Sequence, residues 1–398
     1  MISPFLRRLA NYTLDPKFWT LSNAQLLLKN FYMKNGSTES NDDINLKEAA
    51  EWLKRAQNVN DDGGFSGRYN LKGGWSSSYP ETTGYIIPTF LSLSKELNDK
   101  DYIYRAKKAV NFLLSLQLDE DGFPGGEIHE NKTIPSMFNT GQIINGLLEW
   151  YKYSKDDNVL DAAVKAGNWM VSKQEEDGSW KKFTYLDQVV SYSSHSTCWL
   201  ADLGSYTNNN KFLKSALRHF DWVLKQQNKE TGWFYLSGFF PEDHKENKAV
   251  LHTIAYTLWG VLYMAEIFNR TDGIDAVEKA ALNIADLQEK NKMLPGVLDY
   301  KWNSKSSYSC MTGNAQMALV WLKLYQLKKN KKYLNAAVKA IDSVKKVQDM
   351  KSTDTGIRGG IPGSFPVWGD YMFMAFPNWA AKFFIDALIA KKTALQNN

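Results

Sequence analysis

Two kinds of helical pattern alternate along the chain from residue 44 onward. In the first kind, apolar residues recur at i, i+3, i+4 and i+7 with Lys, Glu or Asp between them, which predicts a helix with one exposed face. The second kind has little charge on any face, which predicts a buried helix. Segments of the first kind cover residues 44–57, 101–117, 157–174, 211–227, 273–288 and 331–348. Segments of the second kind cover residues 82–97, 139–153, 195–206, 252–268, 312–327 and 378–392.

Each half-exposed segment ends at a glutamine, which in most copies is followed by acidic residues and a glycine. These glutamines are Gln57, Gln117, Gln174, Gln227, Gln288 and Gln348, at spacings of 60, 57, 53, 61 and 60 residues. A fixed period of this size indicates a repeat architecture. We therefore predict six repeats of about 58 residues from 44 to 392, after an N-terminal extension, 1–43, with a helical segment around 16–35. Length alone, at about 150 residues per domain, would suggest two or three domains, but the period favours one.

Six half-exposed and six buried helices in alternation favour a closed ring, with the apolar helices inside and the polar-faced helices outside. The predicted fold is therefore all-α: an (α/α)6 toroid, or barrel, of six helical hairpins with an extra N-terminal helix. A straight solenoid of six hairpins is the alternative. A solenoid needs terminal repeats with a polar outer face, and neither terminal repeat has one.

The connections between the segments are of two kinds. Those from a buried segment to the next half-exposed one are short and polar, whereas those in the other direction run about 20–28 residues. Long loops in a compact domain are usually functional. In a ring they all emerge on one rim, where the buried helices begin and their free N–H groups face a central cavity. This geometry predicts a site for a ligand with negative charge.

Polar residues open the buried segments and are the candidates for catalysis. His195 and His252 fall at equivalent positions of successive repeats, Tyr192 precedes His195, and Glu81 lies in the same predicted ring. Each of these side chains can transfer a proton, with a pKa set by burial and by the helix end. The alternatives are that the histidines are structural and that Glu81 and Asn139 are helix N-caps.

The long loops supply candidates for substrate binding. The chain holds 14 Trp, 20 Tyr and 20 Phe, and flat rings around a polar cavity suit sugar faces, isoprenoid chains or cations. Trp180 and Trp233 follow the glutamine motif and are expected to join neighbouring repeats. Arginine in a Gly-rich loop could clamp a carboxylate or phosphate, or could simply be a surface residue. The candidate binding residues are Arg68, Trp75, Tyr79, Asn139, Trp302, Tyr308, Asn314, Arg358, Trp368, Asp370, Tyr371 and Asn378.

Charge and cysteine content indicate which partners and which cellular compartment to expect. The 48 Lys and Arg against 43 Asp and Glu leave a net charge of +5, too mild to indicate nucleic acid. Cys198 and Cys310 cannot form a disulfide framework and fit a reducing compartment. No stretch approaches 18 uninterrupted apolar residues, and the first residues lack an apolar signal-peptide core. We therefore expect a cytoplasmic protein with no integral membrane segment and no nucleic-acid partner.

The Gln-x-x-x-Gly-(Phe/Trp) motifs resemble the QW repeats of squalene/hopene cyclases and of the related prenyltransferase β-subunits, which share an α/α toroid. The resemblance covers nearly the whole chain as architecture. It does not extend to the chemistry: the cyclase Asp-x-Asp-Asp motif is absent, because the acidic runs at 61–64, 119–122 and 175–178 belong to the glutamine motifs. The prenyltransferase zinc site needs Asp, Cys and His, and no short-range ligand pair is present. We expect neither a metal nor an organic cofactor.

The candidate site is chemically closer to carbohydrate-active toroids: uronate lyases, uronyl epimerases, unsaturated-glycuronyl hydrolases and N-acylglucosamine epimerases. Removing a proton α to a carboxylate needs a base, an acid on the other face and neutralisation of the carboxylate. Tyr192 with His195, and His252, could be base and acid, with Asn139, Asn314 or Arg358 on the carboxylate. We therefore predict an enzyme that acts on an acidic, uronate-containing saccharide by proton abstraction, as a lyase or an epimerase.

Three alternatives stay open because one fold supports many chemistries. Glycoside hydrolysis of an acidic glycan needs two carboxylates across the bond, for which Glu81 and Asp370 are the candidate pair. A terpenoid cyclase or prenyltransferase-like enzyme fits the architecture but lacks the acidic motif. A non-catalytic glycan- or peptide-binding toroid is the third.

Overall fold

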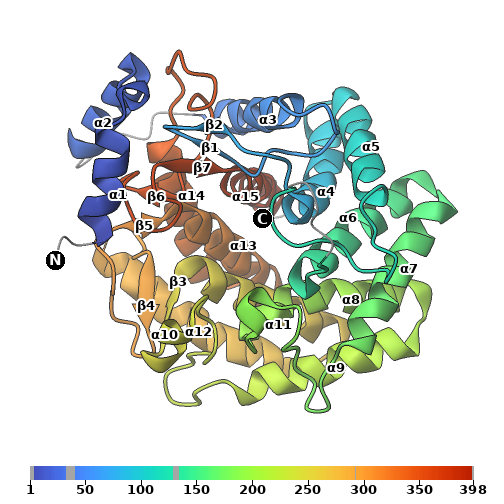
Figure 1. Ribbon diagram of the computed structural model, residues 1–398. Coiled ribbons are helices and arrows are strands. Elements are labelled where there is room, and N and C mark those ends of the chain that lie inside the picture. Colours follow the sequence, from blue (N-terminus) through green and yellow to red (C-terminus); the bar gives the residue numbers. More distant parts are fainter. Residues whose placement is uncertain (1–3, 33–40, 129–133, 292, 397–398) are drawn as a thin grey trace.

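The computed structural model describes residues 4–32, 41–128, 134–291 and 293–396. Its helices form an inner and an outer ring (Figure 1). The outer helices are α3 (Asp42–Asn58), α5 (Asp101–Leu114), α7 (Asp157–Ser172), α9 (Asn210–Lys225), α12 (Thr271–Asn291) and α14 (Lys331–Val347). The inner helices are α4 (Pro80–Glu96), α6 (Met137–Ser154), α8 (Ser194–Thr207), α11 (Leu251–Ile267), α13 (Met311–Lys328) and α15 (Asn378–Gln396). The predicted all-α (α/α)6 toroid is confirmed.

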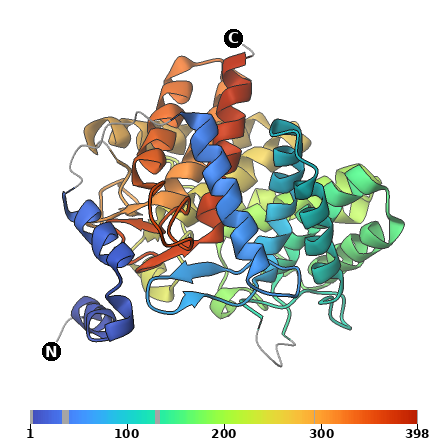
Figure 2. The same ribbon diagram turned by 90° about the horizontal axis from the view of Figure 1, so that it is seen from above.

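The inner helices pack against one another in chain order, and the last of them, α15, packs against the first, α4. Each inner helix also packs against the outer helix that follows it, except at the closure. There α15 has no following outer helix and packs against α3, which opens the first repeat, as Figure 2 shows. Because the two ends of the repeat array are in contact, the solenoid alternative is wrong.

Small residues allow the inner helices to lie close together. Gly146 of α6 faces the backbone of Gly84 in α4, where a Cβ on Gly146 would lie 2.2 Å from the Gly84 carbonyl oxygen. Any larger residue there would force the two helices apart. The apolar side chains of both rings fill the space between them and form one continuous buried cluster.

The repeat glutamines join neighbouring outer helices. The Gln57 amide donates to the Gly63 carbonyl in its own turn (2.9 Å) and to the Arg105 carbonyl on α5 (3.0 Å). Gln117, Gln174, Gln227 and Gln348 make equivalent pairs of hydrogen bonds, and Gln348 reaches α3 across the closure. Trp180 adds a ring contact of 4.8 Å with His219 of the next outer helix, and Trp233 packs on Trp302.

Several elements lie outside the two rings. At the N-terminus are α1 (Pro4–Thr13), the short 3-10 helix η1 (Pro16–Phe18) and α2 (Leu21–Tyr32). The segment predicted around 16–35 contains α2, whereas α1 was not predicted. No helix of the described residues has the length and apolar character needed to cross a membrane.

The long loops contain short elements that the sequence patterns did not predict. They are the 3-10 helices η2 (Tyr185–Asp187) and η3 (Ser191–Ser193), the helix α10 (Pro241–Lys245), and the strands β1 (Arg68–Asn70), β2 (Gly74–Trp75), β3 (Lys248–Val250), β4 (Val297–Asp299), β5 (Ser309–Cys310), β6 (Ser364–Phe365) and β7 (Ala375–Pro377). The strands form three small antiparallel sheets, β2-β1-β7, β3-β4 and β5-β6. Because β1 pairs with β7, the first and last long loops are tied together on one rim.

Candidate functional site

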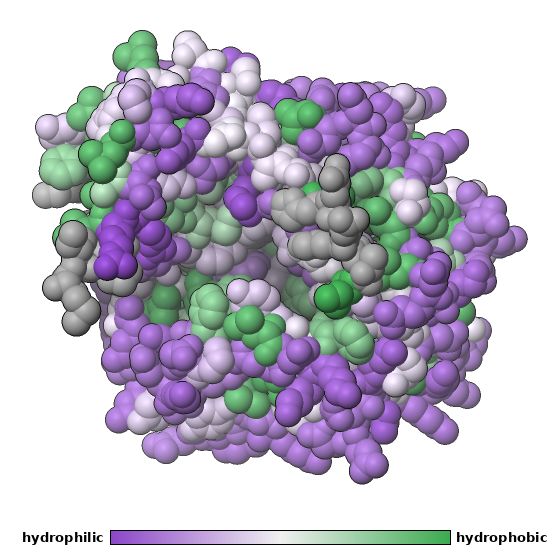
Figure 3. All heavy atoms as spheres, in the orientation of Figure 1, coloured by the Kyte–Doolittle hydropathy of each residue, from purple (hydrophilic) through white to green (hydrophobic). Residues whose placement is uncertain are grey.

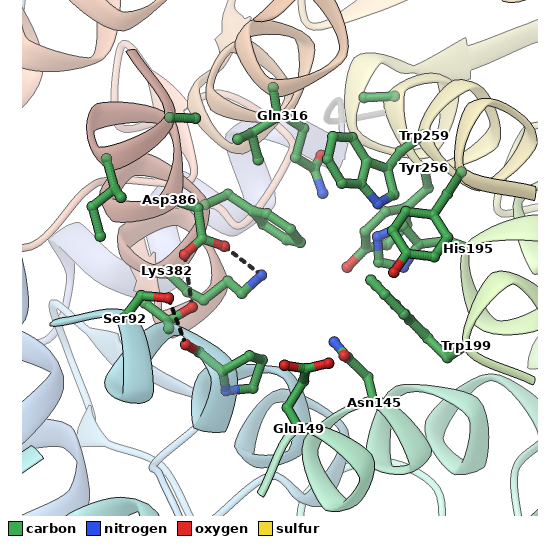
Figure 4. Close-up of a pocket in the computed structure, with 18 residues that line it drawn as sticks. Ser92, Asn145, Glu149, His195, Trp199, Tyr256, Trp259, Gln316, Lys382 and Asp386 are labelled. Carbon is green, nitrogen blue, oxygen red and sulfur yellow. Dashed lines mark hydrogen bonds and ion pairs between the residues drawn. The ribbon is translucent and has the colours of Figure 1, made fainter. Parts of the chain in front are cut away.

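Two sizeable cavities lie along the axis of the ring in the described part of the chain. The larger, about 1000 Å³, lies where the long loops gather and the inner helices begin; we name it the long-loop cavity, and it is lined by Tyr79, Glu81, Tyr192, His252 and Tyr371 among others. The smaller, about 390 Å³, is lined mainly by the later turns of the inner helices and is named the second cavity (Figure 4). Figure 3 shows the hollow at the centre of the ring, with apolar side chains along part of its edge.

Tyr256 of α11 lines both cavities and forms part of the wall between them. Its ring centroid lies 4.1 Å from that of His195 and 4.3 Å from that of His252. Both histidine rings therefore contact the same aromatic side chain.

Glu81 is the buried carboxyl group of the long-loop cavity. It lies in the first turn of α4, is 8% exposed, and accepts a hydrogen bond of 2.7 Å from the Tyr79 hydroxyl. Burial raises the pKa of Glu81 to about 7, and the Tyr79 hydrogen bond opposes that rise only in part. A carboxyl group that titrates near neutral pH is suited to general acid or base catalysis.

The N-cap alternative for Glu81 and Asn139 is wrong. Tyr79 occupies the N-cap position of α4, and Ser136 caps α6 through a side-chain hydrogen bond from the Asn139 backbone N–H. The Asn139 side-chain amide instead donates to the Pro124 carbonyl at 3.2 Å. Neither the Glu81 nor the Asn139 side chain therefore caps its helix, and both line the cavity.

His252 contributes a neutral imidazole to the same cavity. It lies at the second residue of α11, and its Nδ1 is 2.9 Å from Gln316 Oε1. Because an amide oxygen only accepts, Nδ1 carries the proton and Nε2 is left unprotonated. Burial lowers the pKa of His252 to about 4, although the Gln316 hydrogen bond favours the charged form. At neutral pH His252 can therefore accept a proton.

Glu81 and His252 lie on opposite walls of the long-loop cavity. The helices that carry them, α4 and α11, are three places apart in a ring of six inner helices. Burial raises the pKa of five buried tyrosines that line the cavity, so their hydroxyls are neutral hydrogen-bond donors. These tyrosines are Tyr79, Tyr85, Tyr192, Tyr256 and Tyr371. The cavity thus presents a proton donor, a proton acceptor on the facing wall, and several hydroxyls between them.

His195 does not share the long-loop cavity with His252. It lines the second cavity, where its Nδ1 lies 2.7 Å from Gln142 Nε2. The Gln142 oxygen accepts from Trp199 Nε1 at 3.1 Å, so Gln142 presents its N–H to His195. His195 and His252, predicted to act as a pair, therefore line different cavities, each with its ring against Tyr256. Both histidines are the second residue of their helix, but the 3-10 turn η3 leads directly into α8, whereas α11 follows the extended residue Val250.

Other predicted residues are held outside both cavities. Trp75 packs on Trp52 and Tyr69, and Trp302 donates to the Thr231 carbonyl at 2.8 Å. These two tryptophan side chains therefore attach long loops to the rest of the toroid. Tyr308 packs near Gly296 and Gly369; Trp368 and Arg358 line neither cavity.

The polar candidates at the other helix starts serve the fold. Asn314 donates to Ser309 Oγ and the Cys310 carbonyl, and Asn378 donates to the Ser66 carbonyl and Thr82 Oγ1. Arg68 forms an ion pair of 2.6 Å with Glu127. Asp370 pairs with Arg8 and its side chain is 59% exposed, so it is not the second carboxylate opposite Glu81.

Sequence patterns missed several residues that line the long-loop cavity. Tyr85 and Tyr256 follow Glu81 and His252 by four residues, one helical turn further along the same face. The signal was available from helical spacing. Trp379, which donates to the Tyr371 hydroxyl at 2.8 Å, and Phe239 carried no such signal. Among the described residues no group of three or more His, Cys, Asp or Glu side chains is placed to hold a metal ion.

The fold is shared with carbohydrate enzymes of known structure. An unsaturated glucuronyl hydrolase specific for heparin superposes with a TM-score of 0.71 at 15% identity, covering 89% of this chain and 99% of that one. A cellobiose 2-epimerase from Bacillus thermoamylovorans gives 0.68 at 12% identity, covering 92% and 99%. A polysaccharide lyase gives 0.66 at 11% identity, covering 90% and 99%. No curated protein sequence matches the chain.

The fold is thus that of an α/α toroid, and the family model places the chain among carbohydrate-active enzymes. The family model described as the GH127 catalytic domain of β-L-arabinofuranosidase matches residues 24–279, which is more than half of the chain. The chain belongs to this family.

Proposed function

We propose that the protein acts on a saccharide by proton transfer in the long-loop cavity, as a lyase or an epimerase. The observation that carries the proposal is the placement of Glu81 and His252 on opposed inner helices, with pKa values of about 7 and about 4. Between about pH 4 and about pH 7 this leaves a carboxylic acid on one wall and an unprotonated imidazole on the other.

In this mechanism His252 Nε2 takes the proton from a sugar carbon next to a carbonyl or carboxylate carbon. The electron pair of that C–H bond moves into an enolate, whose oxygen accepts hydrogen bonds from the cavity tyrosines. In an epimerase Glu81 returns a proton to the same carbon on the opposite face. In a lyase Glu81 protonates the oxygen that departs from the neighbouring carbon, and an unsaturated sugar is released.

An acidic substrate is part of the proposal. The charges of Lys182 and Asp187, which both line the long-loop cavity, offset each other. The N-terminal ends of α4, α6, α8 and α11 are directed at the cavity, and they favour a carboxylate. The arginines offer no such support, because Arg68 is paired with Glu127 and Arg358 lies elsewhere.

Glycoside hydrolysis is the second candidate, and membership of a glycosidase family favours it. Glu81 would then protonate the departing glycosidic oxygen, and a second carboxylate would be needed across the bond. Asp187 of η2 is the other carboxylate lining the cavity among the described residues. It is exposed and accepts from the Phe183 backbone N–H at 3.0 Å.

The test compares wild type with Glu81→Gln and His252→Gln on uronate polymers and on neutral oligosaccharides. A lyase produces ultraviolet absorbance, an epimerase incorporates solvent deuterium at one sugar carbon, and a hydrolase releases reducing ends without either change. Each variant should lose about 10²–10⁴-fold in rate. Asp370→Asn, which alters a carboxylate outside the cavity, is the matched control and should keep full activity. Full activity in both cavity variants would overturn the proposal.

A further inference from the structure

The second cavity has the features of a ligand-binding pocket and lies at the end of the ring away from the long loops. Its volume of about 390 Å³ falls within the range of about 300–1,000 Å³ typical of small-molecule pockets. Like such pockets, it combines aromatic walls with a few polar groups. None of the groups assigned to proton transfer at the long-loop cavity, Glu81 and His252, lines it.

Asn145 of α6 is the polar group without a partner in this cavity. The residue is 5% exposed, and its side-chain amide has no hydrogen bond to any described residue. Figure 4 shows the amide directed into the cavity, between Glu149 and Trp199. The amide atoms of Asn145 are not among the polar atoms sealed from solvent, so they open onto the cavity. An amide that faces a pocket and makes no bond to the protein is free to bond to a ligand there.

Lys382 brings a second buried donor to the same space. Its side chain is 9% exposed, and its ammonium group forms an ion pair of 2.7 Å with Asp386, which also accepts from Thr89 at 2.8 Å. The ammonium lies 4.1 Å from the Phe383 ring centroid. An ammonium group has three donors, so Lys382 can also donate to a ligand in the cavity, toward which Figure 4 shows it directed.

The wall formed by α8 and α11 is aromatic. Trp199 and Tyr263 have ring centroids 5.0 Å apart, and Trp259 lies 6.4 Å from Tyr263. Such rings offer flat apolar faces beside polar edges. The charges in the cavity are already paired: Lys382 binds Asp386, and Glu149 binds Lys152 at 2.7 Å. A balanced set of charges beside aromatic faces suits a neutral polyhydroxylated ligand better than an anion.

We propose that the second cavity binds one unit of a neutral saccharide. The apolar face of the sugar would lie on Trp199 and Trp259, and its hydroxyls would bond to Asn145 and Lys382. Because Tyr256 stands between the two cavities, this site is separate from the proton-transfer site. The proposal does not depend on the reaction catalysed at the other end.

Fluorine NMR of protein labelled with fluorotryptophan locates binding directly. Among the chain's 14 tryptophans, Trp199 and Trp259 report on the second cavity and Trp379 on the long-loop cavity. The probes are L-arabinose, D-glucose, D-galactose and cellobiose, each titrated to about 100 mM so that weak binding is detected. We expect at least one of them to shift the resonances of Trp199 and Trp259 and to leave Trp379 unchanged.

Two variants test the contacts. Asn145→Leu removes the amide and leaves no protein group unpaired, so the fold should be kept, and Trp259→Ala removes an aromatic face. Each should weaken binding about tenfold or more, whereas Glu81→Gln should change it by less than about twofold. Three results would overturn the proposal: no shift of Trp199 or Trp259 with any probe, undiminished binding in both variants, or binding that moves Trp379 and is lost in Glu81→Gln. Sugar binding here without any catalysis would support this site and count against the proposed function alone.

Discussion

Burial acts in opposite directions on the two titratable groups of the long-loop cavity, since it disfavours the charged form of each. It raises the pKa of Glu81 to about 7 and lowers that of His252 to about 4. If Glu81 donates and His252 accepts a proton, kcat/KM should be bell-shaped, falling below about pH 4 and above about pH 7. The measurement is kcat/KM against pH for wild type and Glu81→Gln. The variant's residual activity should lack the decline above pH 7, and a decline of the same shape in the variant would assign it to another group.

The same carboxyl group also links stability to pH. The pKa of Glu81 is raised in the folded state, so the folded state is favoured at low pH and loses that advantage as pH rises through about 7. At about 1.4 kcal/mol per tenfold change in the proton equilibrium, the buried carboxylate costs about 3 kcal/mol above that pH. Glu81→Gln does not carry this cost. The free energy of unfolding of the variant minus that of wild type should therefore increase by up to about 3 kcal/mol as pH rises from acid to alkaline conditions. Urea unfolding over this pH range tests the sign, and a difference independent of pH would contradict it.

Six residues that the sequence predicts for the site, Tyr79, Glu81, Asn139, Tyr192, His252 and Tyr371, line one cavity. Most of them lie at or next to a helix start, which is visible in the hydrophobic pattern. His195 lines the second cavity instead, and the 3-10 turn η3 that precedes its helix carries no periodic signal in the sequence. Asp370, the predicted second carboxylate, instead pairs with Arg8. That partner lies 362 residues away in the sequence, so no local pattern could reveal the pair.

At the scale of elements, the twelve ring helices were predictable because each carries several turns of regular periodicity. The strands were not, since each is two or three residues long and pairs with a distant loop, as Tyr69 of β1 does with Phe376 of β7. The glutamine motif was visible, and five of its six copies make the same contacts. Gln288 differs: α12 continues for three residues beyond it, to Asn291. Its amide is buried without a partner in the described structure.

This difference gives a matched pair of substitutions. Gln227→Met removes hydrogen bonds to the Gly232 carbonyl (3.3 Å) and the Ala276 carbonyl (2.7 Å). Leaving buried carbonyls unpaired should lower the free energy of unfolding by about 1–3 kcal/mol. Gln288→Met removes a buried amide that makes no bond, so stability should stay within about 0.5 kcal/mol or increase. Denaturant unfolding of both variants is the measurement. Equal losses in free energy of unfolding would show that the hydrogen bonds of the glutamine do not account for its contribution to stability.

At the scale of the whole molecule, the ring is closed by contacts between its first and last repeats. Asp42, at the start of α3, binds Lys345 of α14 at 2.5 Å and Lys391 of α15 at 2.6 Å. Burial alone would raise the pKa of Asp42, but the hydrogen bonds from the two lysines outweigh it and hold the pKa below its usual value. The closure was predictable only as a consequence of the fold, because the residues that form it are about 300 positions apart.

Asp42→Asn tests how much this closure contributes. Its side chain is 34% exposed, so solvent screening reduces the value of the pairs, and we expect a loss of about 1–2 kcal/mol in the free energy of unfolding at neutral pH. The matched control is Asp161→Asn, whose ion pair with Lys165 lies within α7 at the surface and should cost less than about 0.5 kcal/mol. Since the pKa of Asp42 is lowered in the folded state, its contribution exists above the unfolded pKa and is lost as pH falls through the folded one. The difference between wild type and Asp42→Asn should therefore shrink in acid, and a difference that grows there would mean that the closure does not depend on this carboxylate.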